Sequence, residues 1–236
     1  MLPHRDRQPE LMDQPGLDPA EHRRALDGLG RINRASRTAA ALWPPIRGVA
    51  TTVAGRPVRV LDLACGGGQV AVDLVARARG TGVALEICGC DASPAAIDYA
   101  RELARRAGAT SVHFRQLDVL REPLPTGFDV VCATLFLHHL SDEEATTLLG
   151  RMAASAGHLV LVSDLRRTAL GFAFAWAGCR LLSRSRVVRV DGTRSVRAAF
   201  RTSEAQQLAV QAGLAEVTAA ECWPQRYLLA WRRIRD

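Results

Sequence analysis

A glycine-rich turn that directly follows an apolar run is the stretch best suited to hold a ligand. Val58–Leu63 is apolar, Gly66–Gly68 supplies the turn, and a helical pattern follows. Glycines let the backbone approach a ligand closely, and the start of a helix offers unpaired N–H groups. Ala71 completes a Gly-x-Gly-x-x-Ala spacing, and Asp91 follows about 20 residues later. The stretch therefore predicts a site for a nucleoside-containing cofactor.

Asp62 separates two cofactor classes that use such a turn. It stands at the end of the apolar run, just before the glycines. A dinucleotide would bring its pyrophosphate against this carboxylate and be repelled. S-adenosylmethionine carries an ammonium and a sulfonium group and no phosphate, so an anion at this position suits it. The residues favour S-adenosylmethionine and leave a nicotinamide dinucleotide as the alternative.

Alternating strand and helix patterns must position these residues. Strand patterns cover 58–63, 84–90, 112–117, 128–133 and 158–163, and helical patterns cover 68–79, 94–107 and 141–154 between them. This rhythm predicts an α/β fold with a doubly wound, Rossmann-like, mostly parallel sheet. Strands at 214–218 and 227–231 would add an antiparallel edge and bring the sheet to seven strands. Ligands of such sheets bind at the carboxyl ends of the strands, where Asp62, Asp91, Asp118 and Thr134 fall.

The flanking segments differ from this core. Residues 1–17 are proline-rich and polar and predict a flexible tail, whereas 18–236 predict a single domain. Cap helices are expected within 18–50, the second ending at Pro44-Pro45. An insertion over about 166–201 is expected to cap the substrate, with a helix at 168–182 and then an irregular basic stretch with a turn at Asp191-Gly192. A capping box at Ser203 predicts the last helix.

At this point the sequence resembles the class I S-adenosylmethionine-dependent methyltransferases. The resemblance rests on four motifs in the family order over roughly residues 55–165: Val60-Leu-Asp62-Leu-Ala64-Cys-Gly66-Gly-Gly68, Gly89-Cys-Asp91-Ala-Ser93, Gln116-Leu-Asp118-Val119, and Phe128-Asp-Val-Val-Cys-Ala-Thr134-Leu-Phe-Leu-His-His-Leu140. It is closest to the small-molecule branch that modifies quinones and polyketides. Ala64 departs from the glycine that many members carry there.

The resemblance implies a role for each residue of the glycine turn. Asp62 would hold the methionine ammonium through water. Ala64, Gly66 and Gly68 would let the cofactor lie against the backbone.

The later motifs would hold the rest of the cofactor. By the same resemblance, Asp91 would accept from the ribose hydroxyls and Ala92 would flank the adenine. Asp118 would accept from the adenine amino group beside the Val119 N–H, and Thr134 would line the methionine end. An Asp after a strand is also a common turn residue, so a single one indicates little, whereas several in register indicate a cofactor site.

Two regions are candidates for handling the acceptor. His138 and His139 follow the fourth strand near the expected methyl group, and either could take a proton at neutral pH, with His139 favoured. The alternative is that the pair only closes a loop. Phe172, Phe174 and Trp176 could pack an aromatic acceptor under the insertion, with Phe172 and Trp176 as the favoured pair, or they could serve core or dimer packing. The apolar and basic stretch 169–189 also fits peripheral contact with a membrane.

Composition and charge restrict the classes of ligand and the cellular location that we expect. The net charge of +7 invites a nucleic-acid ligand, but every basic residue is Arg, and the motifs of base methylases, Asn-Pro-Pro-Tyr and Pro-Cys, do not occur. Nine Arg and one acid occupy 166–201, so the charge is local. The six cysteines contain no Cys-x-x-Cys pair, and we expect reduced thiols, no metal and a cytoplasmic location. The N-terminus does not read as a signal peptide.

The sequence thus predicts transfer of a methyl group from S-adenosylmethionine to a small lipophilic aromatic acceptor, a phenolic polyketide or quinone precursor. Two alternatives stay open, a catalytically silent S-adenosylmethionine-binding scaffold and a nicotinamide-dependent oxidoreductase. The oligomeric state is also open, a homodimer being one option.

Overall fold

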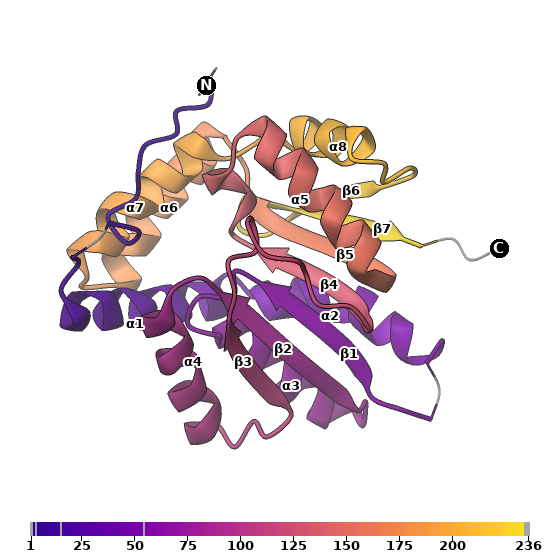
Figure 1. The fold of residues 1–236 in the computed structure, drawn as a ribbon. Helices are drawn as coiled ribbons and strands as arrows, with labels where there is room; N and C mark the ends of the chain where they lie inside the picture. The colour runs from indigo at the N-terminus through magenta and orange to yellow at the C-terminus, as the bar shows by residue number, and fades with distance from the viewer. Residues whose placement is uncertain (1, 3, 15, 54, 234–236) are drawn as a thin grey trace.

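A seven-stranded sheet in the order β3-β2-β1-β4-β5-β7-β6 forms the centre of the computed structural model, which describes residues 2, 4–14, 16–53 and 55–233 (Figure 1). The strands are β1 Val58–Leu63, β2 Leu85–Asp91, β3 Val112–Gln116, β4 Phe128–Thr134, β5 Ala156–Leu165, β6 Thr218–Cys222 and β7 Arg226–Arg232. The first five pair in parallel, and β7 runs antiparallel to both of its neighbours, β5 and β6. The predicted doubly wound sheet is confirmed.

Helices cover both faces of the sheet. On one face lie α2 Thr38–Ala50, α3 Gln69–Thr81 and α4 Pro94–Arg106, and on the other lie α5 Asp142–Ser155 and α8 Thr202–Gln211. Alternate strand residues supply the two cores: the side chain of Val60 packs with the first group and that of Leu61 with the second. Because both faces are covered, β1 and β4 are buried almost throughout.

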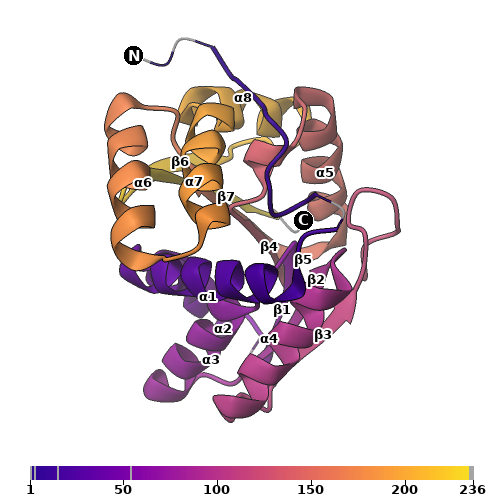
Figure 2. The same ribbon diagram turned by 90° about the vertical axis from the view of Figure 1, so that its left-hand side faces the viewer.

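Three further helices gather at one end of the sheet, on the left in Figure 1. They are α1 Pro19–Ala35, α6 Ala169–Leu182 and α7 Arg186–Ala198. Figure 2 shows α1 lying across the lower ends of α6 and α7, with the N-terminal segment in front. These elements cover the carboxyl ends of the parallel strands, where the cofactor is expected. No helix in the described part of the chain is long and apolar enough to cross a membrane.

Two helix predictions were wrong. Pro44 and Pro45 lie inside α2, because the buried face formed by Leu42, Ile46 and Val49 holds the helix together despite the missing N–H donors. Asp191-Gly192 is no turn but part of α7. A Cβ on residue 192 would lie 2.3 Å from Cys179 Sγ, so this glycine allows α6 and α7 to approach closely.

Smaller differences concern the last helix and the edge strand. The helix α8 starts at Thr202, and Glu204 accepts from the backbone N–H of Arg201 at 2.8 Å, so Ser203 is not the cap. The strand expected at 214–218 lies at 218–222, because Leu214 and Val217 are buried in the turn before it.

The N-terminal segment also differs from the expected flexible tail. Arg5 Nε donates to the Ala198 carbonyl at 2.7 Å, and its guanidinium lies 3.5 Å from the centre of the Phe200 ring. The backbone N–H groups of Leu11 and Met12 donate to the carboxylate of Asp191 at 2.9 and 3.0 Å. Residues 4–14 are therefore bonded along α7 by contacts more than a hundred residues apart in sequence.

Candidate functional site

A cavity of about 1110 Å³ lies at the carboxyl ends of the parallel strands. One part is lined by residues between Ala64 and Thr134, at the carboxyl ends of β1, β2, β3 and β4. The other is lined by the N-terminal segment, α1, the 3-10 turn Leu137–His139, α6, α7 and the turn between β6 and β7. We call these parts the cofactor half and the acceptor half.

The glycine turn divides its tasks between two glycines. Gly66 adopts a φ of +51° and lines the cavity, and a Cβ added there would meet no atom within 4 Å. Gly68 adopts a φ of +72° and does not line the cavity. A Cβ there would lie 2.5 Å from the Phe114 ring and 2.9 Å from the Ala100 Cβ. Gly66 therefore leaves open space for a ligand, whereas Gly68 lets the turn pack on β3 and α4.

Ala64 holds a strained position just before this turn. Its φ is +50°, in the left-handed region that favours glycine. Its side chain lines the cavity. The departure from the family's glycine is therefore accommodated at a cost in backbone strain.

Asp62 is the most unusual polar group in the cofactor half. Its side chain is fully buried and does not line the cavity directly. The Cys132 thiol donates to Oδ1 at 3.6 Å, and Oδ2 has no hydrogen-bond partner among the described residues. Burial raises the pKa of Asp62 to about 7. An unpartnered buried carboxylate oxygen beside an open turn fits a cationic ligand or the water that contacts it.

The later strands bring their predicted residues to the same wall. Asp91 Oδ2 accepts from the Gly66 N–H at 2.8 Å, and Oδ1 accepts from the Ser93 N–H at 2.9 Å. The carboxylate thus joins two of the motifs and keeps further acceptor positions on the cavity side, and its pKa is raised mainly by burial. Ala92, Asp118, Val119 and Thr134 also line the cavity.

Only one of the three aromatic residues predicted on the insertion helix lines the acceptor half, and a fourth comes from outside it. Phe174 and Trp223 line the cavity, with ring centres 5.6 Å apart. Phe172 and Trp176 do not: Arg197 lies over the Phe172 ring and Arg180 over the Trp176 ring, and Trp176 is 50% exposed. The helix turns Gly171, Phe174, Gly178 and Leu182 inward, so positions 172 and 176 fall on its other side.

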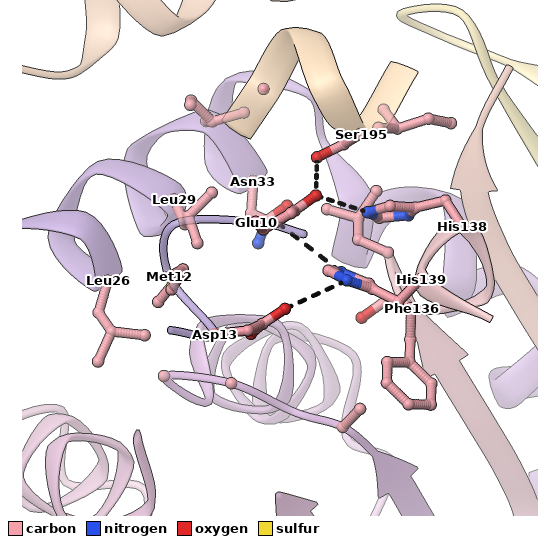
Figure 3. A pocket seen from close by; sticks show the side chains of 18 of the residues that line it. Glu10, Met12, Asp13, Leu26, Leu29, Asn33, Phe136, His138, His139 and Ser195 are labelled. Carbon is pink, nitrogen blue, oxygen red and sulfur yellow. Dashed lines mark hydrogen bonds and ion pairs between the residues drawn. The ribbon is translucent and has the colours of Figure 1, made fainter. Parts of the chain in front are cut away.

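His138 and His139 lie in the acceptor half beside a residue that the sequence did not suggest. Both rings face Glu10 of the N-terminal segment (Figure 3). Glu10 Oε1 is 3.6 Å from His138 Nε2, and Glu10 Oε2 is 4.0 Å from His139 Nε2. On the other side of His138, Nδ1 lies 2.7 Å from Asp164 Oδ1, and its backbone N–H donates to Oδ2 at 3.0 Å. Asp13 Oδ2 is 3.5 Å from His139 Nδ1.

These contacts separate the charge states of the two histidines. Burial alone would lower the pKa of His138, but Asp164 and Glu10 outweigh it and raise the pKa to about 10. Burial, and then the charge of His138, lower the pKa of His139 to about 4. Near neutral pH the His138 imidazole is therefore positively charged, with a proton on both ring nitrogens, whereas the His139 imidazole is neutral.

Sequence reasoning missed three residues that line the acceptor half, Glu10, Asp13 and Trp223, and the buried Asp164 behind His138. Asp164 stands at the end of a predicted strand, as Asp62 and Asp91 do, and that position could have identified it. Glu10 and Asp13 lie in a stretch without periodicity, and Trp223 lies in a turn. None of the three therefore had a local sequence pattern that indicated a site.

Comparisons with known proteins agree with this geometry. Residues 60–156 match the family model described as a methyltransferase domain. A demethylmenaquinone methyltransferase of Thermus thermophilus is 37% identical over 108 residues, which cover 45% of this chain and 47% of that protein. A ubiquinone biosynthesis O-methyltransferase of Paracidovorax citrulli is 31% identical over 122 residues, covering 51% and 49%. The chain thus spans about half the length of the curated relatives it matches.

A solved structure extends the likeness of fold beyond the matched domain. The S-adenosylmethionine-dependent methyltransferase SibL superposes with a TM-score of 0.63 at 23% identity, covering 86% of this chain and 56% of that one. Strand order, the glycine turn and the domain match agree, and the matched part of the chain, residues 60–156, is a class I S-adenosylmethionine-dependent methyltransferase domain.

Proposed function

We propose that the protein transfers a methyl group from S-adenosylmethionine to a small lipophilic aromatic acceptor with an acidic hydroxyl or activated ring carbon, such as a phenolic polyketide or quinone precursor. The observation that carries the proposal is that one cavity joins the open turn at Gly66, beside the unpartnered Asp62 oxygen, to a half lined by Phe174 and Trp223.

The cofactor half fits S-adenosylmethionine in the chemistry of its donors. The buried Asp62 carboxylate suits the methionine ammonium, and Asp91 suits the two ribose hydroxyls. Asp118 and Val119 would hold the adenine, and Thr134 the methionine end. The cofactor supplies a methyl group already activated by the sulfonium, so the chain has to position the acceptor in line and exclude water.

The acceptor half favours an apolar ring. Phe174, Trp223 and Leu182 offer aromatic and aliphatic contacts beside the cofactor half. The matched relatives are named demethylmenaquinone methyltransferase and ubiquinone biosynthesis O-methyltransferase, and these names support a quinone-like acceptor here.

A proton must leave a hydroxyl acceptor, and His139 is the favoured recipient. The His139 imidazole is neutral near neutral pH and lines the cavity, so it can accept a proton. The His138 imidazole is already positively charged and is stabilised in that form by Asp164. Because the lowered pKa makes His139 a weak base, acidic hydroxyls such as those of phenols and hydroquinones are preferred.

Turnover of S-adenosylmethionine with a labelled methyl group, across a panel of phenols, hydroquinones and catechols, tests this function. We expect label in an organic-soluble product and calorimetric binding of S-adenosylhomocysteine. Binding without turnover on any acceptor would favour the silent scaffold. Tight NADH binding with none of S-adenosylhomocysteine would favour the oxidoreductase, which the position of Asp62 disfavours.

A lipophilic acceptor also gives a role to the outer face of α6, which we propose contacts an anionic membrane surface. Leu170, Trp176 and Leu181 are 51%, 50% and 83% exposed, and Arg180 and Arg184 lie exposed beside them. Flotation with anionic liposomes should recover the wild type and less of Leu181→Ser. Equal recovery with neutral and anionic liposomes would contradict the contact and leave dimer packing as the use of this face.

The free cysteines favour a cytoplasmic location.

A further inference from the structure

Three side chains in the acceptor half place ligand atoms around one point. Glu10, His138 and His139 each offer one nitrogen or oxygen atom, and all three atoms lie within 4.8 Å of one another. The Glu10 oxygens stand 3.6 and 4.0 Å from the two Nε2 atoms. These separations exceed ordinary hydrogen-bond lengths of about 2.7–3.2 Å. They approach the roughly 3.3 Å between neighbouring ligand atoms around a tetrahedral ion with bonds of about 2.0–2.1 Å.

Both imidazoles are oriented in the same way. The rings of His138 and His139 lie with centres 4.2 Å apart at 33°, and their Nε2 atoms point to the same carboxylate (Figure 3). The opposite ring nitrogen, Nδ1, faces Asp164 in one case at 2.7 Å and Asp13 in the other at 3.5 Å. A carboxylate behind each imidazole is the outer support that metal-binding histidines commonly have, because it fixes the tautomer and the ring.

We propose that Glu10, His138 and His139 bind a divalent transition-metal ion of the Zn²⁺ class. Two imidazole nitrogens and one carboxylate suit this class better than Mg²⁺ or Ca²⁺, which prefer oxygen ligands. Three protein ligands leave a fourth position open, and all three residues line the cavity. The open position therefore faces the space for the acceptor.

The ion would also hold the N-terminal segment in place. Glu10 comes from this segment, whose next two backbone N–H groups donate to Asp191 of α7. The histidines come from the 3-10 turn Leu137–His139 after β4. One ion would thus join two parts of the chain that are about 130 residues apart and close one side of the acceptor half.

The site narrows the acceptor to an oxygen nucleophile, and this part of the inference rests on the proposed function. A hydroxyl bound to the open position would lose its proton to solvent and stay as an oxyanion. The oxygen pair then forms the new C–O bond, while the C–S bond breaks with its pair on sulfur. His139 acts in that case as a ligand and not as the base.

Binding of the metal alone tests the site. The full chain is stripped with a chelator and titrated with Co²⁺, whose visible absorption reports coordination number and ligand type. We expect one equivalent to bind with tetrahedral or five-coordinate bands and to be displaced by Zn²⁺. Octahedral bands only, or a sulfur-to-cobalt charge-transfer band that places the ion on a cysteine, would overturn the proposal.

Matched variants localise the ion. Glu10→Gln and His139→Asn remove one ligand each and should weaken Co²⁺ binding at least tenfold. Asp164→Asn should weaken it about 10–100-fold through the orientation of His138. The exposed controls Glu143→Gln and His113→Asn should bind as the wild type does. Circular dichroism identifies any variant that fails to fold, and equal affinity in a folded Glu10→Gln and the wild type contradicts the site.

The metal site and the proposed function can fail separately. Co²⁺ binding without binding of S-adenosylhomocysteine keeps the site and removes the methyl transfer. If chelator-stripped protein methylates an acceptor, and added Zn²⁺ does not raise the rate, the metal proposal is contradicted. His139 would then act as the base.

Discussion

The two halves of the cavity are built in different ways. The cofactor half consists of turns that follow β1, β2, β3 and β4, and its residues lie within the continuous stretch 62–134. The acceptor half combines the N-terminal segment, α1, the 3-10 turn after β4, α6, α7 and the turn before β7, which are far apart in sequence. In the first half the sheet fixes the backbone, whereas in the second half long-range side-chain contacts fix it. A cofactor site can therefore be encoded by residues close together in sequence, whereas the shape of the acceptor half depends on contacts between distant segments.

The strongest test of this contrast separates packing from ligand contact inside the turn itself. Gly68→Ala should lower the free energy of unfolding by about 3 kcal/mol, because its Cβ would overlap the Phe114 ring at a positive φ. Gly66→Ala meets no atom within 4 Å and should cost less stability but more affinity for S-adenosylhomocysteine. Urea denaturation and calorimetry measure the two effects. Equal losses of stability would show that the turn does not divide its tasks.

Asp62 tests whether the cofactor half depends on charge. Asp62→Asn should weaken cofactor binding by about 2 kcal/mol, since a hydrogen bond between charged groups is lost. In the wild type the pKa of about 7 means that binding the ammonium expels a proton, so affinity should rise by up to about tenfold per pH unit until pH 7 and then level. Calorimetry from pH 5.5 to 7.5 measures this slope. A slope that persists in Asp62→Asn would assign it to another group.

The same residue has the opposite effect on the unliganded fold. The raised pKa means that the folded chain binds this proton more tightly than the unfolded chain. The stability that it contributes is complete below about pH 4 and is lost as the pH rises through about 7. Asp62→Asn should remove this loss, which urea denaturation at several pH values measures.

The acceptor half is tested by one pair of aromatic residues on the same helix. Phe174→Ala should raise the KM for the acceptor about fivefold, or roughly 1 kcal/mol, because the ring lines the cavity against Trp223. Trp176→Ala should leave KM within about twofold, since that ring lies outside the cavity. Steady-state kinetics with soluble acceptors measures both. A larger effect at Trp176 would favour the inward face predicted from the sequence.

The smallest expected effect concerns the strained residue before the turn. Ala64→Gly should raise the free energy of unfolding by about 0.5 kcal/mol, because relief of the positive φ outweighs the added freedom of the unfolded chain. Ala76→Gly, at an exposed position inside α3, should lower it by about 1 kcal/mol. Thermal unfolding measures the pair, and a loss at both positions would mean that Ala64 is not strained.

Much of the fold could be predicted from the sequence because the patterns that indicate helices and strands are local. The period of apolar residues predicted five strands and most helices, and Ser93 and Ser141 cap the helices that they were expected to cap. Predictions failed where packing outweighed propensity, as at Pro44-Pro45 inside α2 and at Gly192 inside α7. There the backbone preference of a residue pair is smaller than the free energy gained by burying the face around it.

Local sequence patterns were sufficient to predict the sheet, the glycine turn and the acids at its edge, because the residues involved are neighbours along the chain or follow a fixed period. Three features became visible only in the folded chain: which glycine lines the cavity, which face of α6 turns inward, and that Glu10 lies beside His138 and His139. These relations depend on how distant segments pack, and no local pattern records a contact between residues 10 and 138. The cofactor therefore follows from motifs within one stretch, whereas the residues that line the acceptor half and the proposed metal ligands follow from the folded chain.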